Sequence, residues 1–191
     1  MVERPAEVLT RGPVTLLRWR AADAGTVCRL VLGSLEHLRP WMTWAAEFGP
    51  VDAARFTEQC DQDWEQGVAY NYAITSAGAP VGSAGLMARI GPGALEIGYW
   101  VGAAHVRQGL ATAAAAALTD AGFGMAGIER IEIVHDQANV ASAGVPRKLG
   151  FAEVARRPNP DGPQTPGDSG TDVVWRLTRR DWLRAVSVPS R

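Results

Sequence analysis

The residues whose types and spacing suggest chemistry lie in a loop and the helix expected after it. The segment "AAHVRQGLATAAAAALTDAGF", residues 103–123, follows the apolar run Leu95–Val101 and carries Arg107 and Gly109 before five consecutive alanines. The first turn of a helix leaves main-chain N–H groups without acceptors and carries partial positive charge, so it can bind a phosphate. Gly109 would let the main chain approach an anion closely. Alternatively, Gly109 is only a turn residue and the alanines allow a helix to pack closely on a sheet.

Several other motifs for phosphates and metals do not occur. The chain contains no Gly-x-x-x-x-Gly-Lys-Ser/Thr loop, and no Gly-x-Gly-x-x-Gly precedes the alanine-rich helix. Cys28 and Cys60 are the two cysteines, with no Cys-x-x-Cys or Cys/His cluster around them. The sequence therefore predicts neither a nucleoside-triphosphate loop nor a disulfide framework, and no metal site.

Length and charge narrow the class of protein further. A chain of 191 residues with a formal net charge of −1 fits one domain, residues 1–191, with no overall field to attract nucleic acid or acidic lipid. The N-terminal "MVERPAEVLTRGP" lacks an apolar signal core, and no run reaches the roughly 20 apolar residues of a membrane span. We expect a cytoplasmic protein without nucleic-acid or membrane partners.

The first half of the chain is expected to form a strand, two helices and three further strands. Val14–Trp19 is strand-like, and a helix capped by Asp23 should run to Leu38 before Pro40. A second helix is expected at 51–67. The turns "AGAP" and "GPG" separate three strand candidates, "AYNYAITS", "VGSAGLMARI" and "ALEIGYWV", which should form an antiparallel meander.

The second half begins with the alanine-rich helix, which should reach about residue 125. A strand at 128–136 then completes a strand–helix–strand crossover. "NVASAGVPRKLGF" predicts a helix that ends at Gly150 and contains an unusual internal Pro146. Two final strands, "FAEVARR" and "TDVVWRLT", should flank a mobile loop at 158–170.

This order of elements resembles the GNAT superfamily of N-acetyltransferases, and within it the branch of ribosomal-protein N-terminal alanine and serine acetyltransferases. The likeness extends from "LRPWMTWA" through "EIGYWV" to "KLGF". It implies an α+β, three-layer αβα fold with a mixed, mostly antiparallel sheet of about six to seven strands. Helices would cover both faces, and the fourth and fifth strands would splay apart. The implied activity is acetyl transfer from acetyl-CoA to a primary amine by direct attack in a ternary complex, without a metal.

The resemblance also implies which residues bind coenzyme A. The family's loop Gln/Arg-x-x-Gly-x-Gly/Ala falls on residues 106–111, where Val106 departs from the pattern. The pyrophosphate would be held by the main-chain amides of Arg107, Gln108, Gly109, Leu110, Ala111 and Thr112. The pantetheine arm would pair with the main chain of Tyr99, Trp100 and Val101 at the splayed strand end. A main-chain N–H at a strand bulge near Val101 would stabilise the oxyanion.

Acetyl transfer to an amine requires a group that takes up the amine proton. Glu96 lies on the strand "ALEIGYWV", and a partly buried carboxylate there could accept that proton directly or through water. The alternative is an outward-facing carboxylate that is merely solvated. Glu132, Glu153 and His135 compete for the same role, His135 because its ordinary pKa suits proton transfer near neutrality.

The departing sulfur requires a hydrogen-bond donor. Many family members use a tyrosine seven residues after an asparagine, but Pro146 occupies that place here. The ribosomal-protein branch instead has a serine three residues after the asparagine, which matches Ser142. The resemblance implies that Ser142 acts as the acid or stabilises the thiolate, while Asn139 holds the pantetheine amide. Alternatively, "NVAS" is only a helix cap followed by a small helix residue.

The acceptor amine is expected to enter beside aromatic residues. "LRPWMTWA" resembles the stretch that shapes the acceptor cleft, so we expect Trp41, Trp44 and Tyr72 to bind substrate, although such residues are often core. The acidic loop 161–172 could attract a cationic amine or peptide, or could simply be solvated. Trp182 is expected either to close the core or to lie in a dimer contact. A homodimer is therefore one of the two alternatives.

Three functional alternatives remain at this stage. The acceptor of an acetyl group could be a protein N-terminus or a small-molecule amine. The donor could instead carry another acyl group such as succinyl, with Arg89 or Arg39 as its cationic partner. A non-catalytic acyl-CoA-binding module is the third, although the presence together of Asn139, Ser142 and Glu96 argues against it.

Overall fold

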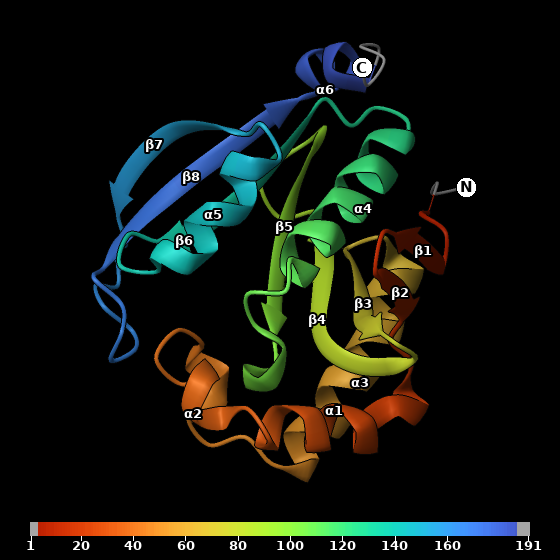
Figure 1. The fold of residues 1–191 in the computed structure, drawn as a ribbon, viewed down its shortest axis with the longest axis vertical. Helices are drawn as coiled ribbons and strands as arrows, with labels where there is room; N and C mark the ends of the chain where they lie inside the picture. Colours follow the sequence, from red (N-terminus) through yellow and green to blue (C-terminus); the bar gives the residue numbers. More distant parts are fainter. Residues whose placement is uncertain (1–3, 187–191) are drawn as a thin grey trace.

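A computed structural model describes residues 4–186, and its centre is one eight-stranded sheet (Figure 1). The strand order is β1-β2-β3-β4-β5-β6-β8-β7, and all neighbours are antiparallel except β5 and β6. The strands are β1 (Val8–Arg11), β2 (Val14–Arg18), β3 (Ala69–Ser76), β4 (Ala79–Met87), β5 (Ala94–Val101), β6 (Arg130–Asp136), β7 (Ala152–Pro158) and β8 (Thr171–Thr178). The mixed, mostly antiparallel sheet is confirmed. The predicted strand number was one too low, because the short and mostly exposed β1 shows no apolar alternation.

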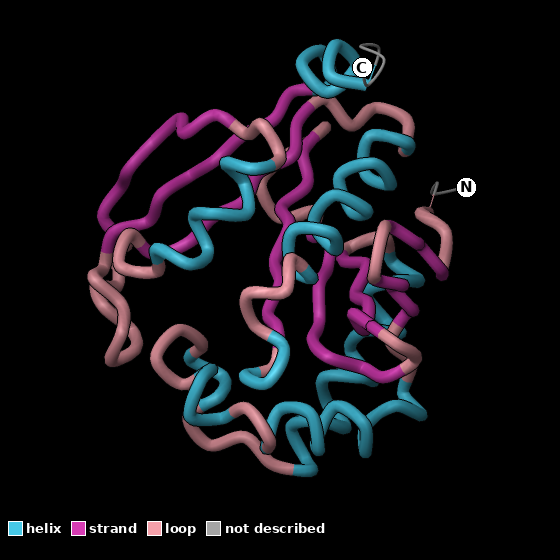
Figure 2. The backbone as a smooth tube through the Cα atoms, in the orientation of Figure 1, coloured by secondary structure: helices cyan, strands magenta, loops and turns pink. Residues whose placement is uncertain are grey.

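Helices cover both sides of this sheet. They are α1 (Ala24–Leu32), α2 (Leu35–Leu38), α3 (Pro50–Gln66), α4 (Leu110–Gly124), α5 (Val140–Lys148) and α6 (Arg179–Val186), with short 3₁₀ turns at Ala21–Asp23, Thr43–Ala45 and Ala103–His105. In Figures 1 and 2, α4 and α5 lie in front of the sheet, and α1, α2 and α3 gather around its lower end. α4 packs on β1, β2, β4 and β5, whereas α3 packs on β3 and α1.

The alanines of α4 do pack closely on the sheet. Ala114 and Ala115 are fully buried, and a Cβ added to Gly122 would lie 2.8 Å from Cδ1 of Ile131. Small side chains at these positions let the helix axis approach the strands. Close packing therefore explains the body of this helix, which leaves its first turn to be explained separately.

The predicted helix between Asp23 and Leu38 is interrupted. α1 ends at Leu32 and α2 starts at Leu35, so the break falls at Gly33 and Ser34. The Asp23 carboxylate does not cap α1, because its Oδ2 accepts a hydrogen bond from the Arg20 amide at 2.9 Å across the preceding 3₁₀ turn. Ser34 accepts a bond from the Ala103 amide through its Oγ at 3.3 Å, which ties this break to the end of β5.

β5 and β6 separate along their length, as predicted for the fourth and fifth strands expected from the sequence. Their parallel pairing runs only from Ala94↔Arg130 to Ile97↔Ile133, although β5 continues to Val101 and β6 to Asp136. The β4–β5 register is continuous from Gly82↔Val101 to Met87↔Glu96, so the bulge expected near Val101 does not occur. Main-chain groups at the end of β5 consequently face an opening because β6 has moved away.

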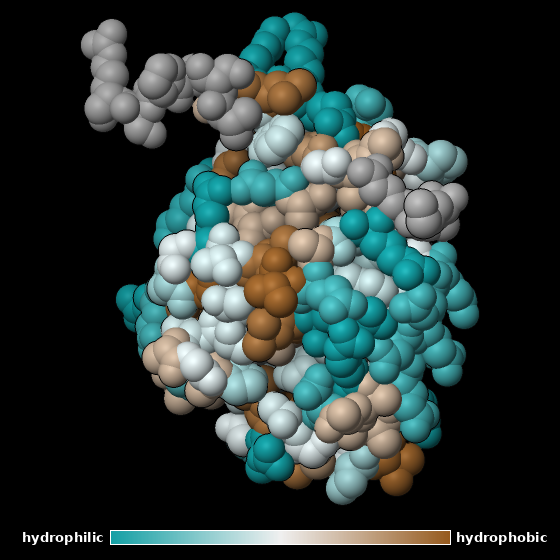
Figure 3. All heavy atoms as spheres, turned by 90° about the vertical axis from the view of Figure 1, so that its right-hand side faces the viewer, coloured by the Kyte–Doolittle hydropathy of each residue, from teal (hydrophilic) through white to brown (hydrophobic). Residues whose placement is uncertain are grey.

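The face of the molecule that carries β1 and β2 is mostly polar (Figure 3). Figure 3 shows the side that carries β1 and β2, where a narrow apolar strip is surrounded by polar side chains. At the C-terminal end, the Trp182 ring stacks on Phe123 with centroids 5.2 Å apart and donates to Asp120 at 3.0 Å. Trp182 thus closes the core at α4. Within residues 4–186, no helix has both the length and the apolar character needed to cross a bilayer.

Candidate active site

The opening between β5 and β6 leads into a cavity of about 980 Å³. Its wall comes from β3, β4, β5 and β6, from α1, α3 and α5, from the segment between α2 and α3, and from the loop after β7. Seven of the predicted site residues line it: Trp41, Trp44, Glu96, Tyr99, Trp100, Asn139 and Ser142. The sheet splay therefore brings together residues that lie up to 101 positions apart in the sequence, from Trp41 to Ser142.

The first turn of α4 lies at the surface beyond the end of β5, and residues 107–112 do not line this cavity. Residues 107–109 are exposed, and no heavy atom lies within 4 Å of a Cβ added to Gly109. Gly109 has φ +77° and Arg107 has φ +61°, a conformation that is uncommon for a residue with a side chain. Among residues 4–186, no side chain caps this helix N-terminus. The exposed loop at Gly109 therefore has room for an anion beside the start of α4.

Glu96 is the acidic side chain of β5 that reaches the cavity. It is 8 % exposed and forms an ion pair with Arg89, whose side chain is 61 % exposed. Its neighbour in the parallel register is Glu132, whose carboxylate instead pairs with Arg130 at 3.3 Å and Arg176 at 2.7 Å. Glu132 does not line the cavity, so the two adjacent carboxylates have different surroundings.

The other two candidate bases have their polar atoms engaged. Glu153 lies on the exposed strand β7, where its hydrogen bond to Arg156 lowers the pKa of its carboxyl group. His135 lines the cavity, but its Nε2 accepts from Trp175 Nε1 at 2.9 Å and its Nδ1 lies 2.7 Å from the Asp136 carbonyl oxygen. These partners require a neutral ring with its proton on Nδ1. Glu96 is also paired, with Arg89, but it is the candidate carboxylate that lines the cavity, so geometry favours it among the four.

Ser142 lies in the first turn of α5. It faces the end of β5 that is still paired with β4 but no longer with β6. Its Oγ and its carbonyl oxygen are each 3.1 Å from the Tyr99 hydroxyl oxygen. Asn139 is the N-cap of α5, because its Oδ1 accepts from the Ser142 amide at 3.1 Å. The cap therefore uses the side-chain oxygen of Asn139 and leaves its amide nitrogen for another partner.

Aromatic rings also line the cavity. Trp44 is 42 % exposed, and its ring lies 5.7 Å from Phe48 and 6.0 Å from Trp100, centroid to centroid. Tyr72 is placed elsewhere. It is fully buried against Trp64, donates to the Ala6 carbonyl oxygen at 2.9 Å and does not line the cavity. The expected substrate contact of Tyr72 therefore has no support in this geometry.

Carboxylates from β6, β8 and the loop between β7 and β8 line a further part of the cavity, namely Asp136, Asp168 and Asp172. Burial opposes ionisation of Asp136, but hydrogen bonds with Asp168, Ser169 and Ala138 outweigh it, so the pKa of Asp136 is lowered. The loop reaches the α2 side of the cavity, where Thr165 Oγ1 and the Gly167 amide donate to the Pro40 carbonyl oxygen at 2.6 and 3.0 Å. The second half of the loop, which was predicted as mobile, is thus bonded to Pro40 and, through Ser169, to Asp136.

Sequence reasoning missed two features of this region. It did not identify Arg89 as the partner of Glu96, and it gave the Tyr99 side chain no role. No local pattern pointed to Arg89, because the ion pair joins the loop after β4 to β5 and depends on how these two strands pair. For Tyr99 a signal existed, because an internal proline such as Pro146 removes one helix hydrogen bond and leaves a carbonyl that needs another donor.

The sheet is mixed, its parallel pair splays apart, and in the described part of the chain the helix after β5 begins without a side-chain cap. The model of the acetyltransferase (GNAT) domain family matches residues 14–152. The chain therefore belongs to the GNAT acetyltransferase family, which confirms the predicted family, fold and enzyme class.

Individual relatives agree with this assignment. The protein YdaF of Bacillus subtilis, named as a ribosomal N-acetyltransferase, is 26 % identical over 175 residues, covering 88 % of this chain and 93 % of its own length. RimL, a ribosomal L7/L12 α-N-protein acetyltransferase solved with coenzyme A, superposes with a TM-score of 0.82 at 20 % identity, covering 90 % of this chain and 98 % of RimL. The microcin C7 self-immunity acetyltransferase MccE, solved with acetyl-CoA and AMP, has a TM-score of 0.79 at 21 % identity, covering 87 % and 92 %.

Proposed function

We propose that this chain transfers an acetyl group from acetyl-CoA to a primary amine by direct attack within a ternary complex. The observation that carries the proposal is the β5–β6 opening. It places Glu96, Tyr99, Trp100 and Ser142 in one cavity, while the free amides of α4 begin just beyond the same strand. A donor with a diphosphate at one end and a thioester at the other would span that distance along β5.

The donor side is provided mainly by main-chain groups. The amides of residues 107–112 would hold the diphosphate, and the unpaired end of β5 from Tyr99 to Val101 would pair with the pantetheine arm. Bound acetyl-CoA supplies the activated acetyl group. Arg39 donates to the Ala45 carbonyl oxygen and does not line the cavity, and Arg89 is paired with Glu96. Because Arg39 lies outside the cavity and the charge of Arg89 is already balanced by Glu96, we propose acetyl over succinyl as the acyl group.

The reacting amine must lose a proton, and the leaving sulfur must gain a hydrogen bond. Glu96 would accept the amine proton directly or through water, and Arg89 would hold the carboxylate in place. Ser142 would donate its hydroxyl hydrogen to the departing sulfur, on the opposite side of the opening. A thiol with a pKa of about 8.5 needs only such hydrogen bonding to leave.

The acceptor we propose is the N-terminal amine of a protein. YdaF and RimL are both named for ribosomal or α-N-protein acetylation, and the cavity presents more carboxylates than arginines beside an exposed tryptophan. Such a lining suits a cationic chain end followed by an apolar side chain. MccE, by contrast, was solved with the small molecule AMP, so small-molecule amines are the acceptors against which peptides should be compared.

Two measurements test this function together. Melting temperature is measured with acetyl-CoA, succinyl-CoA, ATP and NAD at the same concentration, and thiol release is then followed with short peptides and small amines. We expect stabilisation by acetyl-CoA, none by ATP or NAD, and thiol release that is faster with free N-terminal peptides than with their blocked forms.

The outcomes separate the alternatives clearly. Donor binding without thiol release from any acceptor would favour a non-catalytic acyl-CoA-binding module. Faster release with small amines than with peptides would replace the proposed acceptor. Replacing Ser142 with Ala should lower turnover about tenfold while the dissociation constant of acetyl-CoA stays nearly unchanged. An equal loss in both quantities would instead assign Ser142 to donor binding.

A further inference from the structure

The Pro146 position gives α5 an incomplete hydrogen-bond ladder. In a regular α-helix the N–H of residue 146 donates to the carbonyl oxygen of residue 142, but proline has no N–H. The carbonyl oxygen of Ser142 is therefore deprived of its helical donor. The carbonyl is partly buried, so leaving it without a protein donor costs some free energy, and a replacement donor is favoured.

The replacement comes from β5 and not from α5. The Tyr99 hydroxyl lies 3.1 Å from the Ser142 carbonyl oxygen and 3.1 Å from Ser142 Oγ. A phenol can donate one hydrogen bond and accept another. Tyr99 can thus donate to the orphaned carbonyl and accept from the serine hydroxyl, so that both polar atoms are satisfied by one side chain.

This pairing also directs the Ser142 hydroxyl. A serine inside a helix usually bonds to a carbonyl of the preceding turn, which turns its hydroxyl along the helix. Within residues 4–186, Tyr99 is the only hydrogen-bond partner of Ser142 Oγ. The hydroxyl consequently points across to β5, in the part of the strand where pairing with β6 has ended at Ile97.

We propose that Tyr99 is a positioning residue: its hydroxyl replaces the helix hydrogen bond that Pro146 removes and thereby holds the Ser142 hydroxyl in the opening between β5 and β6. This inference rests on the proposed acetyl transfer, in which Ser142 donates to the leaving sulfur. As the sulfur becomes negative, the Ser142 hydrogen turns from Tyr99 to the sulfur, while Tyr99 keeps its own bond to the carbonyl. No proton leaves Tyr99 in this arrangement.

The state of the phenol agrees with such a role. Burial raises the pKa of Tyr99 to about 12, against a smaller lowering by its bond to Ser142. The phenol is therefore neutral at physiological pH and remains a hydrogen-bond donor. It is suited to orienting Ser142 and poorly suited to giving up its proton.

A set of five variants tests the proposal: Tyr99→Phe, Ser142→Ala, the double variant of these two, Pro146→Ala, and Tyr99→Phe combined with Pro146→Ala. Tyr99→Phe should lower kcat about tenfold with the KM for acetyl-CoA within about twofold of wild type. Because both residues act through one hydroxyl, the double variant should be no slower than Ser142→Ala alone. Thr57→Val serves as the control, since it removes a buried hydroxyl that bonds helix carbonyls at 3.0 and 3.1 Å outside the cavity.

Pro146→Ala separates positioning from mere stability. It returns an N–H to α5, so it should restore the melting temperature that Tyr99→Phe lowers, yet leave kcat low because Ser142 Oγ still lacks its partner. Recovery of kcat together with melting temperature would overturn the proposal, since Tyr99 would then be only structural. Wild-type kcat in Tyr99→Phe, or an equal further loss from Tyr99→Phe in the Ser142→Ala background, would overturn it as well.

Failure of the proposed function gives a different result. If the wild-type chain releases no thiol with any amine, the acetyl-transfer role is lost, and the unfolding measurements alone judge the Tyr99 contact. In that case the destabilisation by Tyr99→Phe must be smaller in the Pro146→Ala background. Equal destabilisation in both backgrounds would reject the replacement of the helix hydrogen bond.

Discussion

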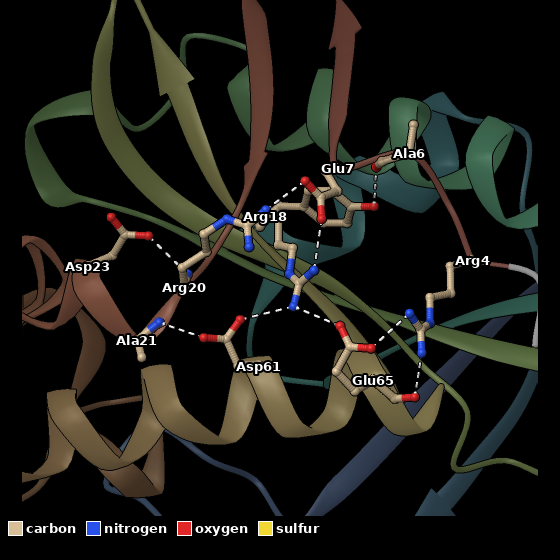
Figure 4. Close-up of polar contacts among 10 residues, drawn as sticks. Arg4, Ala6, Glu7, Arg18, Arg20, Ala21, Asp23, Asp61 and Glu65 are labelled. Carbon is tan, nitrogen blue, oxygen red and sulfur yellow. Dashed lines mark hydrogen bonds and ion pairs between the residues drawn. The ribbon is translucent and has the colours of Figure 1, made fainter.

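Two ion-paired clusters on this sheet look alike at the level of residue types but differ in their surroundings. At the end of β2, the Arg18 side chain is 8 % exposed and pairs with Glu7 at 2.8 Å, Asp61 at 2.9 Å and Glu65 at 3.4 Å (Figure 4). Its guanidinium also lies 4.6 Å from the centre of the Trp64 ring. This Arg18 cluster joins the segment before β1 to α3, and none of its members lines the cavity.

The Arg89–Glu96 pair has the opposite arrangement. Here the acidic residue is the buried member, because the Glu96 side chain is 11 % exposed. A single arginine, with a side chain that is 61 % exposed, holds it. Both residues line the cavity. The comparison teaches that burial and ion pairing do not by themselves mark a catalytic group. What distinguishes Glu96, the base we propose, is that it lines the cavity.

The largest effect should follow from removing the charge of Glu96. Glu96→Gln keeps the side-chain size but cannot accept the amine proton, so kcat should fall roughly 100-fold with little change in the KM for acetyl-CoA. Thiol-release kinetics measure this. The matched control is Glu132→Gln on the neighbouring strand, which should lower the melting temperature yet keep turnover. Similar turnover in both variants would erase the distinction between the two carboxylates.

An intermediate effect is expected in the Arg18 cluster, and on stability only. Arg18→Met retains much of the apolar stem but loses the hydrogen bonds to three carboxylates, so the free energy of unfolding should fall by about 2 kcal/mol. The loss is limited because these carboxylates are partly exposed and can be rehydrated. Urea denaturation gives the free energy. Lost turnover at a temperature where the variant is fully folded would connect this cluster to the site.

The smallest effect should come from Asp136. This residue lines the cavity, as Glu96 does, but its hydrogen bonds hold a loop in place. Its oxygens accept from the Ala138 amide at 2.7 Å and from Ser169 Oγ at 2.9 Å. Since folding lowers the pKa of Asp136, its stabilisation is present above the unfolded pKa of about 3.9 and is lost as pH falls toward the folded value.

Asp136→Asn should therefore lower the melting temperature by about 2 °C at pH 7, and the difference from wild type should shrink between pH 5 and 3. Melting curves across that range measure it. Asp61→Asn, which changes a carboxylate of the Arg18 cluster, provides a comparison away from the cavity. A difference that grows on acidification would contradict the sign of the pKa shift.

Much of the fold followed from patterns along the chain. Alternating apolar residues predicted seven of the eight strands, and Gly67 and Gly150, both in the left-handed region, end the predicted helices near where they were expected. The helix between Asp23 and Leu38 was predicted as continuous because its apolar spacing is nearly regular. The break falls at Gly33, which was a local signal for a helix end, and at Ser34, whose Oγ accepts from the Ala103 amide 69 positions away.

The candidate site was predicted less evenly. Ser142 and Asn139 were placed by resemblance and Glu96 by the chemistry that an amine acceptor requires, and all three line one cavity. Tyr72 and Tyr99 both lie on apolar strands, and the alternation of those strands does not tell which tyrosine faces the opening. Only the sheet register shows that Tyr72 turns into the core and Tyr99 toward α5.

Local chemistry was settled by the amino acids themselves. A glycine at position 109 permits a left-handed backbone before α4, and a proline at position 146 removes a helix donor in any fold, because these are properties of single residues. The identity of the group that replaces that donor depended on the assembled sheet. Tyr99 and Ser142 are 43 positions apart, and they meet because β5 and β6 diverge and α5 packs across the gap. Hydrogen bonds act over about 3 Å, so such partners are determined by packing and not by proximity along the chain.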